Sequence, residues 1–112
     1  MINVNENYRQ FTGTENYYKY NSGLLLTDGV RQVAEDLKCF WLIDIIASYQ
    51  HKINLDFQVW KLSRTVGSMF VVTCQDGNYN EVIRQEIDYS DFEGDELTVW
   101  CESPVLLLPT EH

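Results

Sequence analysis

The sequence is poor in the residues and motifs from which metal and enzyme sites are commonly built. It has only two histidines, His51 and His112, and its three cysteines stand singly without a CxxC pair. It contains no Gly-rich phosphate loop, no GxSxG elbow and no HExxH helix. We therefore expect no metal and no cofactor. Whether the protein is an enzyme stays open at this point, with the balance against it.

Long hydrophobic runs and targeting signals are also missing. No apolar stretch approaches the roughly 18 residues of a membrane-spanning helix, and residues 1–6 have neither a basic region nor an apolar core typical of a signal peptide. The odd number of cysteines indicates buried free thiols in a reducing compartment. We expect a cytoplasmic protein that does not contact membranes.

Basic residues are nearly absent from the last third of the chain. The formal net charge is −9, and residues 1–75 contribute nothing to it, with seven acidic and seven basic side chains. Residues 76–112 hold ten acidic side chains against Arg84 alone. Such a field repels phosphate backbones, so we expect no direct nucleic-acid binding. It suits a basic protein partner, or it serves only to keep the protein in solution.

What the sequence does contain is enough apolar material for one packed core. The chain has 112 residues, of which 45% are hydrophobic and 13% aromatic. No internal repeat and no Pro- or Ser-rich linker divides it. We therefore predict a single domain over residues 1–112.

Two helices are predicted in the first half. Thr27 is a plausible N-cap for a helix over residues 28–38, whose apolar residues form one stripe. Residues 40–51 are apolar around most of a helical circumference and leave a narrow polar notch at Asp44, Ser48 and His51. A helix of this kind must be covered on several sides, so we expect it at the centre of the domain.

From Asn54 onward the hydrophobic pattern has a period of two, which predicts strands over residues 56–62, 68–75, 81–88 and 96–101. Asp76-Gly77 is a strong hairpin signal between the second and third strands. The apolar tail within residues 104–109 is too short for a helix. These elements predict an α+β fold with two main helices packed on one face of a four-stranded antiparallel meander sheet.

The alternation of the last strand places Trp100 on the face opposite the helices, and we expect Trp60 to join it there. Large aromatic side chains on an uncovered sheet face are typical of interfaces. We expect a homodimer through this face, with Leu106 and Leu108 of the tail as further interface candidates. A monomer whose tail covers the tryptophans is the other possibility.

The polar notch is a candidate site, together with Tyr17 and Tyr20 of an aromatic cluster. Asp44, Ser48 and His51 are stacked along one helix face, but a catalytic triad requires the histidine in the middle. Asp44 and His51 lie about 10 Å apart along the helix. We therefore read the notch as an exposed polar seam, or as a buried Asp44 that accepts hydrogen bonds from amides or a tyrosine hydroxyl.

Six blocks of the sequence form a characteristic set: residues 11–18, Leu26-Thr27-Asp28-Gly29-Val30, residues 40–50, Phe57-Gln58-Val59-Trp60, residues 73–78 and Leu106-Leu107-Leu108-Pro109. Together they resemble a family of small bacterial proteins of unknown function that also occurs in phage and plasmid genomes. The family usually has a tyrosine before the tryptophan of the helix, where this chain has Phe40. The resemblance implies a single-domain bacterial cytosolic protein and supplies no activity.

The function is not given by any of these features. The leading hypothesis is a non-enzymatic protein-interaction module, a small acidic homodimer serving as an accessory or regulatory protein of phage or plasmid type. The competing hypothesis is a small-ligand-binding protein or enzyme with a pocket near Asp44 and His51.

Overall fold

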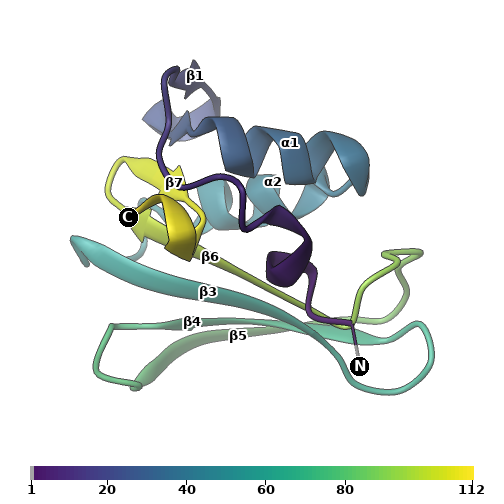
Figure 1. Ribbon diagram of the computed structural model, residues 1–112. Coiled ribbons are helices and arrows are strands. Elements are labelled where there is room, and N and C mark those ends of the chain that lie inside the picture. The colour runs from purple at the N-terminus through teal and green to yellow at the C-terminus, as the bar shows by residue number, and fades with distance from the viewer. Residues whose placement is uncertain (1) are drawn as a thin grey trace.

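The protein consists of one twisted sheet with two α-helices on one of its faces (Figure 1). The structure is a computed structural model that describes residues 2–112. The helices are α1 (Asp28–Asp36) and α2 (Phe40–Tyr49), and short 3₁₀ turns are η1 (Val4–Tyr8), η2 (Asn21–Gly23) and η3 (Pro109–Glu111). The strands are β1 (Tyr18–Lys19), β2 (Leu25–Leu26), β3 (Phe57–Arg64), β4 (Phe70–Gln75), β5 (Glu81–Ile87), β6 (Glu96–Glu102) and β7 (Val105–Leu107).

The prediction of an α+β protein with two main helices agrees with the structure, but the predicted four-stranded antiparallel meander is wrong. The sheet has seven strands in the order β1-β2-β7-β6-β3-β4-β5. All four predicted strands exist, yet β6 pairs with β3 rather than with its predecessor β5. The sheet is also mixed, because β2 and β7 pair in parallel while the other pairs are antiparallel.

Arg64 anchors the loop by which the chain returns after β5 to the open edge of β3. Its guanidinium donates hydrogen bonds to the carbonyl oxygens of Phe92 (2.8 Å) and Gly94 (3.0 Å) and to the Asp95 carboxylate (2.9 Å). It also donates to the Gly67 carbonyl. The Phe92 ring packs edge-on against Phe70 of β4, with the ring centroids 5.7 Å apart. These contacts hold the loop between β5 and β6 across the ends of β3 and β4, and β6 then begins beside the open edge of β3.

The three short strands have no recognisable sequence pattern, since each has two or three residues. β7 is the apolar tail, which adds to the sheet between β6 and β2. Leu106 and Leu108 lie in the core with exposed fractions of 0% and 1%. The prediction that they belong to an interface with a partner is therefore wrong, because folding already buries them.

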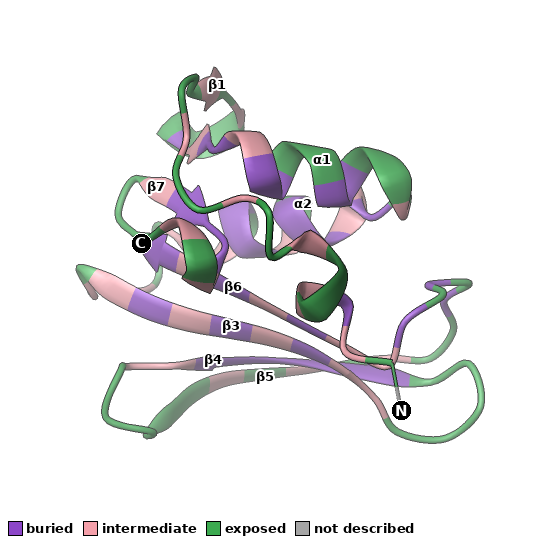
Figure 2. Ribbon diagram, viewed as in Figure 1, coloured by how far each residue is buried: buried purple, intermediate pink, exposed green. Residues whose placement is uncertain are grey.

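Helix α2 is less enclosed than its apolar circumference predicts: four of its ten residues are buried, and its other apolar side chains are half-buried. Figure 2 shows buried and intermediate segments along its ribbon. Leu42 and Ile46 are fully buried, whereas Asp44 and Ser48 of the polar notch are exposed. The placement of Trp60 on the opposite sheet face is wrong. Trp60 is 1% exposed, and its indole nitrogen donates to the Gln58 side chain at 2.8 Å within the core.

The C-terminal tail is held at the first turn of α1 by the carboxylate of Glu111. This group accepts hydrogen bonds from the Thr27 hydroxyl (2.6 Å), the Gly29 amide (3.0 Å) and the Leu108 amide (2.9 Å). An anion at a helix N-terminus is stabilised by the free amides and by the helix dipole. The fit requires a glycine: a Cβ at position 29 would lie 2.7 Å from Glu111 Oε1 and 2.8 Å from Leu108 Cδ1.

No helix within residues 2–112 combines the length and the apolar character needed to cross a bilayer.

We expect the substitution Gly29→Ala to destabilise the protein by about 1–3 kcal/mol, because it forces the buried Leu108 and the Glu111 carboxylate apart. In an ordinary helix the same change would stabilise by up to about 1 kcal/mol. Gly13→Ala is the matched control, since a Cβ there meets no atom within 4 Å. Urea unfolding of both variants is the measurement, and equal midpoints would contradict the proposed fit.

We expect Arg64→Ala to lower the free energy of unfolding by about 2 kcal/mol, because several carbonyl groups and the Asp95 carboxylate lose their donor. Arg64→Lys should recover little of this, since an ammonium cannot reproduce the planar array of guanidinium donors. Arg9→Ala is the control, because Arg9 makes only an exposed 3.8 Å ion pair with Glu6. An Arg64→Ala variant as stable as Arg9→Ala would contradict this role.

Candidate functional site

The sheet face turned away from the helices carries a mixture of aromatic and polar side chains. Antiparallel partners share a face, so the pairs Val59–Trp100 and Lys61–Thr98 lie together on this outer face. The neighbouring pairs Trp60–Val99 and Leu62–Leu97 point into the core, where all four residues are buried. Trp100 is therefore on the outer face, as the sequence predicted, while Trp60 is not.

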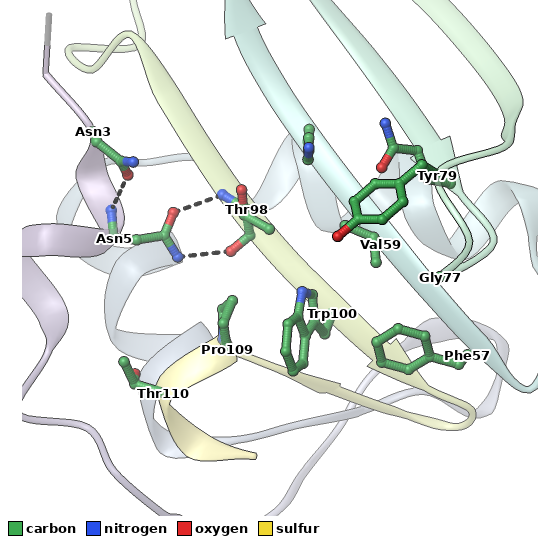
Figure 3. Close-up of a pocket in the computed structure, with 12 residues that line it drawn as sticks. Asn3, Asn5, Phe57, Val59, Gly77, Tyr79, Thr98, Trp100, Pro109 and Thr110 are labelled. Carbon is green, nitrogen blue, oxygen red and sulfur yellow. Dashed lines mark hydrogen bonds between the residues drawn. The ribbon is translucent and has the colours of Figure 1, made fainter.

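A groove of about 530 Å³ runs over this face where β3 and β6 lie side by side (Figure 3). Phe57 and Val59 of β3 and Trp100 of β6 form its aromatic and aliphatic part. Polar residues of the strands also line it, namely Lys61, Gln75 and Thr98. Further lining residues come from the N-terminal segment, the β4–β5 hairpin and the C-terminal 3₁₀ turn, and they include Asn3, Asn5, Tyr79, Pro109 and Thr110. Segments far apart in the sequence thus build one concave surface.

Trp100 is the largest side chain of the groove and is held by rings on two sides. Its ring lies edge-to-face with Phe57 (centroids 5.4 Å apart, 76°) and with His112 (5.5 Å, 75°). The His112 imidazole is itself 2.7 Å from the Glu102 carboxylate. Within residues 2–112 no group accepts a hydrogen bond from the Trp100 indole nitrogen, so this donor is available to a ligand.

Tyr79 stands at the tip of the β4–β5 hairpin and is 85% exposed. The backbone of this turn is fixed by the Asp76 carboxylate, which accepts hydrogen bonds from the amides of Asn78 and Asn80 and from the Asn80 side chain. These bonds, that of the Asn80 side chain first, hold the pKa of Asp76 below its usual value. Gly77, with φ of +86°, brings the hairpin against the Phe57 ring, which a Cβ would approach to 2.9 Å.

The opposite wall of the groove is formed by the N-terminal segment. The Asn5 side chain donates to the Thr98 carbonyl at 2.8 Å and accepts from the Thr98 amide at 2.7 Å, as drawn in Figure 3. It thus pairs with β6 as a backbone peptide would. Asn3 makes a parallel bridge with Glu96 further along the same strand.

The polar notch predicted on α2 does not form a single site with the tyrosines. The Tyr20 hydroxyl donates to Asp44 at 2.7 Å, and the Ser48 hydroxyl donates to the Ile45 carbonyl at 2.6 Å. His51 lines a separate shallow cavity with residues of η2 and the chain before β3. Tyr17 is 58% exposed. The Asp44 carboxylate accepts a hydrogen bond from a tyrosine hydroxyl, as one of the two interpretations of the notch predicts. That interpretation also placed Asp44 in the interior, whereas the residue is exposed.

The other reactive side chains do not converge. No group of three or more His, Cys, Asp or Glu side chains within residues 2–112 is placed to hold a metal ion. Cys39, Cys74 and Cys101 are buried free thiols. Burial raises the pKa of Cys39 and Cys74 to about 12 and that of Cys101 to about 11. These thiols are therefore protonated at neutral pH and are poor nucleophiles.

Sequence reasoning found Trp100 but missed the other groove residues. Phe57 and Val59 lie in the strand predicted over residues 56–62, but their position beside Trp100 follows from the pairing of β3 with β6, which the sequence does not reveal. Tyr79 stands two residues after Gly77 of the Asp76-Gly77 turn signal, so an exposed aromatic at a hairpin tip was the one signal that could have located this wall of the groove.

A model of the family of unknown function DUF6876 matches residues 2–112, and the chain belongs to this family. No curated protein and no solved structure matches the chain.

The tyrosine–carboxylate pairs yield a prediction for titration. Burial and the hydrogen bond to Asp44 raise the pKa of Tyr20 to about 12, and burial and Asp36 raise that of Tyr8 to about 12. A raised pKa of a tyrosine stabilises the fold below pH 10, and this contribution is lost as the pH rises from 10 through 12. We expect Asp44→Asn to lower the pKa of Tyr20 and to leave that of Tyr8 unchanged.

The measurement is an NMR titration of ring-labelled tyrosine, with Asp36→Asn as the matched control that should move Tyr8 alone. A Tyr20 titration that is identical in the wild type and in Asp44→Asn would show that the hydrogen bond does not form.

Proposed function

We propose that this member of DUF6876 is a non-enzymatic protein-interaction module whose outer groove binds an extended, basic segment of a partner protein. One observation supports this proposal above the others. The groove that contains Trp100, Phe57 and Tyr79 is open and lies on the outer sheet face of a chain with a net charge of −9.

The aromatic composition of the groove suits side chains of lysine and arginine. Cations bind over the faces of tryptophan and tyrosine rings, with a gain of about 0.5–2 kcal/mol depending on how far water is excluded. Tryptophan and tyrosine are also the residues most enriched among those that dominate binding energy at interfaces. Trp100 is held by two neighbouring rings, so ordering it on binding costs little conformational entropy.

The charge of the chain supports a basic partner over an acidic one. An excess of carboxylates attracts a cationic segment over long range and raises its association rate, in a manner that salt weakens. Lys61 is the one basic residue that lines the groove. Its ammonium suits the backbone carbonyl oxygens of an extended segment. Phosphate backbones would be repelled by the same field, which disfavours a nucleic acid as the direct ligand.

Three further elements belong to this proposal. The module acts as a homodimer, it resides in the cytoplasm, and it serves as an accessory or regulatory protein of phage or plasmid type. The free, protonated thiols are compatible with a reducing compartment. The homodimer is compatible with the sheet architecture, in which no segment of residues 2–112 pairs with the outer edge of β5.

The competing hypothesis of a pocket near Asp44 and His51 receives less support. The Asp44 carboxylate already accepts from Tyr20, and the cavity beside His51 is lined by Ser22, Gln50 and their neighbours rather than by Asp44. A small-ligand site needs polar groups that converge on one concave space.

The test is a screen of a random decapeptide array with the purified protein. We expect the retained peptides to be enriched in Lys and Arg, and their binding to weaken at least about tenfold in Trp100→Ala, the loss of one central aromatic contact. Tyr79→Ser should weaken it to a smaller extent. Affinity should also fall as the salt concentration rises.

Tyr89→Ser is the matched control, since Tyr89 is 73% exposed and does not line the groove. Circular dichroism checks that each variant is folded. Peptides that are predominantly acidic, or binding that Trp100→Ala and Tyr89→Ser change equally, would contradict the proposal.

A further inference from the structure

The two edges of the sheet differ greatly in length. One edge is β1, which has two residues, and the other is β5, which has seven. Among residues 2–112 no segment pairs with the outer edge of β5. A long strand edge with unpaired amide and carbonyl groups is a template for another strand.

Strand β6 also has an edge that β7 covers only in part, and the N-terminal segment pairs with the rest of it. The half of β6 that β7 does not reach is covered by the Asn5 side chain and by the Asn3 bridge. The chain therefore satisfies the edge of β6 with its own residues and leaves β5 free. We propose that the free edge of β5 pairs antiparallel with β5 of a second copy of this chain, centred on Gln85.

The amino-acid order of β5 supports this pairing. The segment Ile83-Arg84-Gln85-Glu86-Ile87 is self-complementary when read against itself in the opposite direction. Centred on Gln85, each Arg84 lies opposite Glu86 of the second copy, and each Ile83 lies opposite Ile87. Opposite charges directly across an antiparallel pair are stabilising, as are aliphatic pairs.

The two symmetric registers next to this one are disfavoured by the same side chains. A pairing centred on Arg84 sets Arg84 against its own copy, and one centred on Glu86 does the same with two carboxylates. Like charges directly opposite each other are destabilising. The charges thus favour the register centred on Gln85 over the two registers next to it. Charged residues usually protect a strand edge from pairing, but here their alternating signs permit it with this one partner.

The charged pairs and the aliphatic pairs of the proposed interface lie on opposite faces of β5. Arg84 lies on the outer face beside Thr73, and its Nε and Nη2 bond Glu81 at 3.0 Å. The guanidinium has five donor hydrogens, so others remain for a second carboxylate. Ile83 and Ile87 lie on the inner face and pack against the core, but they are only partly buried. A second copy would complete the burial of both.

The pairing has a consequence for the groove. Residues directly opposite each other in an antiparallel pair point to the same face. The two-fold axis is therefore perpendicular to the sheet, and the outer faces of both copies lie on the same side of the joined sheet. The dimer would present two copies of the groove on one continuous surface, which favours a partner with two basic segments through effective concentration. In this respect the inference rests on the proposed function. It gives the homodimer an interface at the β5 edge in place of the outer sheet face that the sequence analysis expected.

The test is a charge-reversal experiment read by sedimentation and native mass spectrometry. We expect the wild type to form a dimer of 13.1 kDa chains. Arg84→Glu and Glu86→Arg should each place like charges across the interface and weaken the dimer on the order of tenfold. The double variant Arg84→Glu/Glu86→Arg restores opposite charges and should recover the dimer.

Mixing the two single variants provides the sharpest readout. Arg84→Glu has two carboxylates on this face and Glu86→Arg has two guanidinium groups, so a one-to-one mixture should form a heterodimer although neither forms a homodimer well. Arg9→Glu and Glu93→Arg are matched controls, because they make the same charge changes at exposed positions outside β5. Both controls should dimerise as the wild type does.

The possible failures can be told apart. A wild type that stays monomeric at high micromolar concentration overturns this inference and the homodimer, but it leaves the groove and its peptide test untouched. A dimer that Arg84→Glu and Glu86→Arg do not weaken overturns the β5 interface alone. Loss of peptide binding in Trp100→Ala with an intact dimer supports the groove independently of the interface.

Discussion

The structure depends on the hydrogen bonds by which Arg64 holds the loop between β5 and β6. In a meander β6 would pair with β5 as the next strand. Here the anchored loop crosses the ends of β4 and β3, and β6 lies on the open edge of β3. Arg64 is the last residue of β3, so one side chain links the end of that strand to the loop that determines where β6 begins.

Both candidate surfaces follow from this strand order. Because β6 lies beside β3, Trp100 comes next to Phe57 and Val59, and the groove has an aromatic wall. Because β6 does not cover β5, the longest free edge of the sheet carries a self-complementary segment. A meander would have separated Trp100 from Phe57 and buried the edge of β5. The groove and the proposed dimer interface are therefore two results of one connection.

The local elements could be predicted from the sequence, and their assembly could not. Hydrophobic periodicity predicts α1, α2 and the four longer strands, because burial of one face imposes a regular spacing of apolar residues along a helix or a strand. The strand order depends on contacts between Arg64 and residues about thirty positions away, which no local pattern records. Trp60 and Trp100 show the limit: alternation within one strand is readable, but the relative faces of β3 and β6 depend on their register. The helix N-terminus after Thr27 could be predicted, whereas the group that binds there, the Glu111 carboxylate, lies at the far end of the chain.

The strand order can be measured directly by NMR, through nuclear Overhauser effects between backbone protons of neighbouring strands. The account predicts cross-strand effects between Lys61 and Thr98 and between Val59 and Trp100, the partners in the β3–β6 register. Cross-strand effects between β5 and β6 of the same chain, with none between β3 and β6, would contradict it. In that case the groove would lose its aromatic wall and β5 would no longer be an edge.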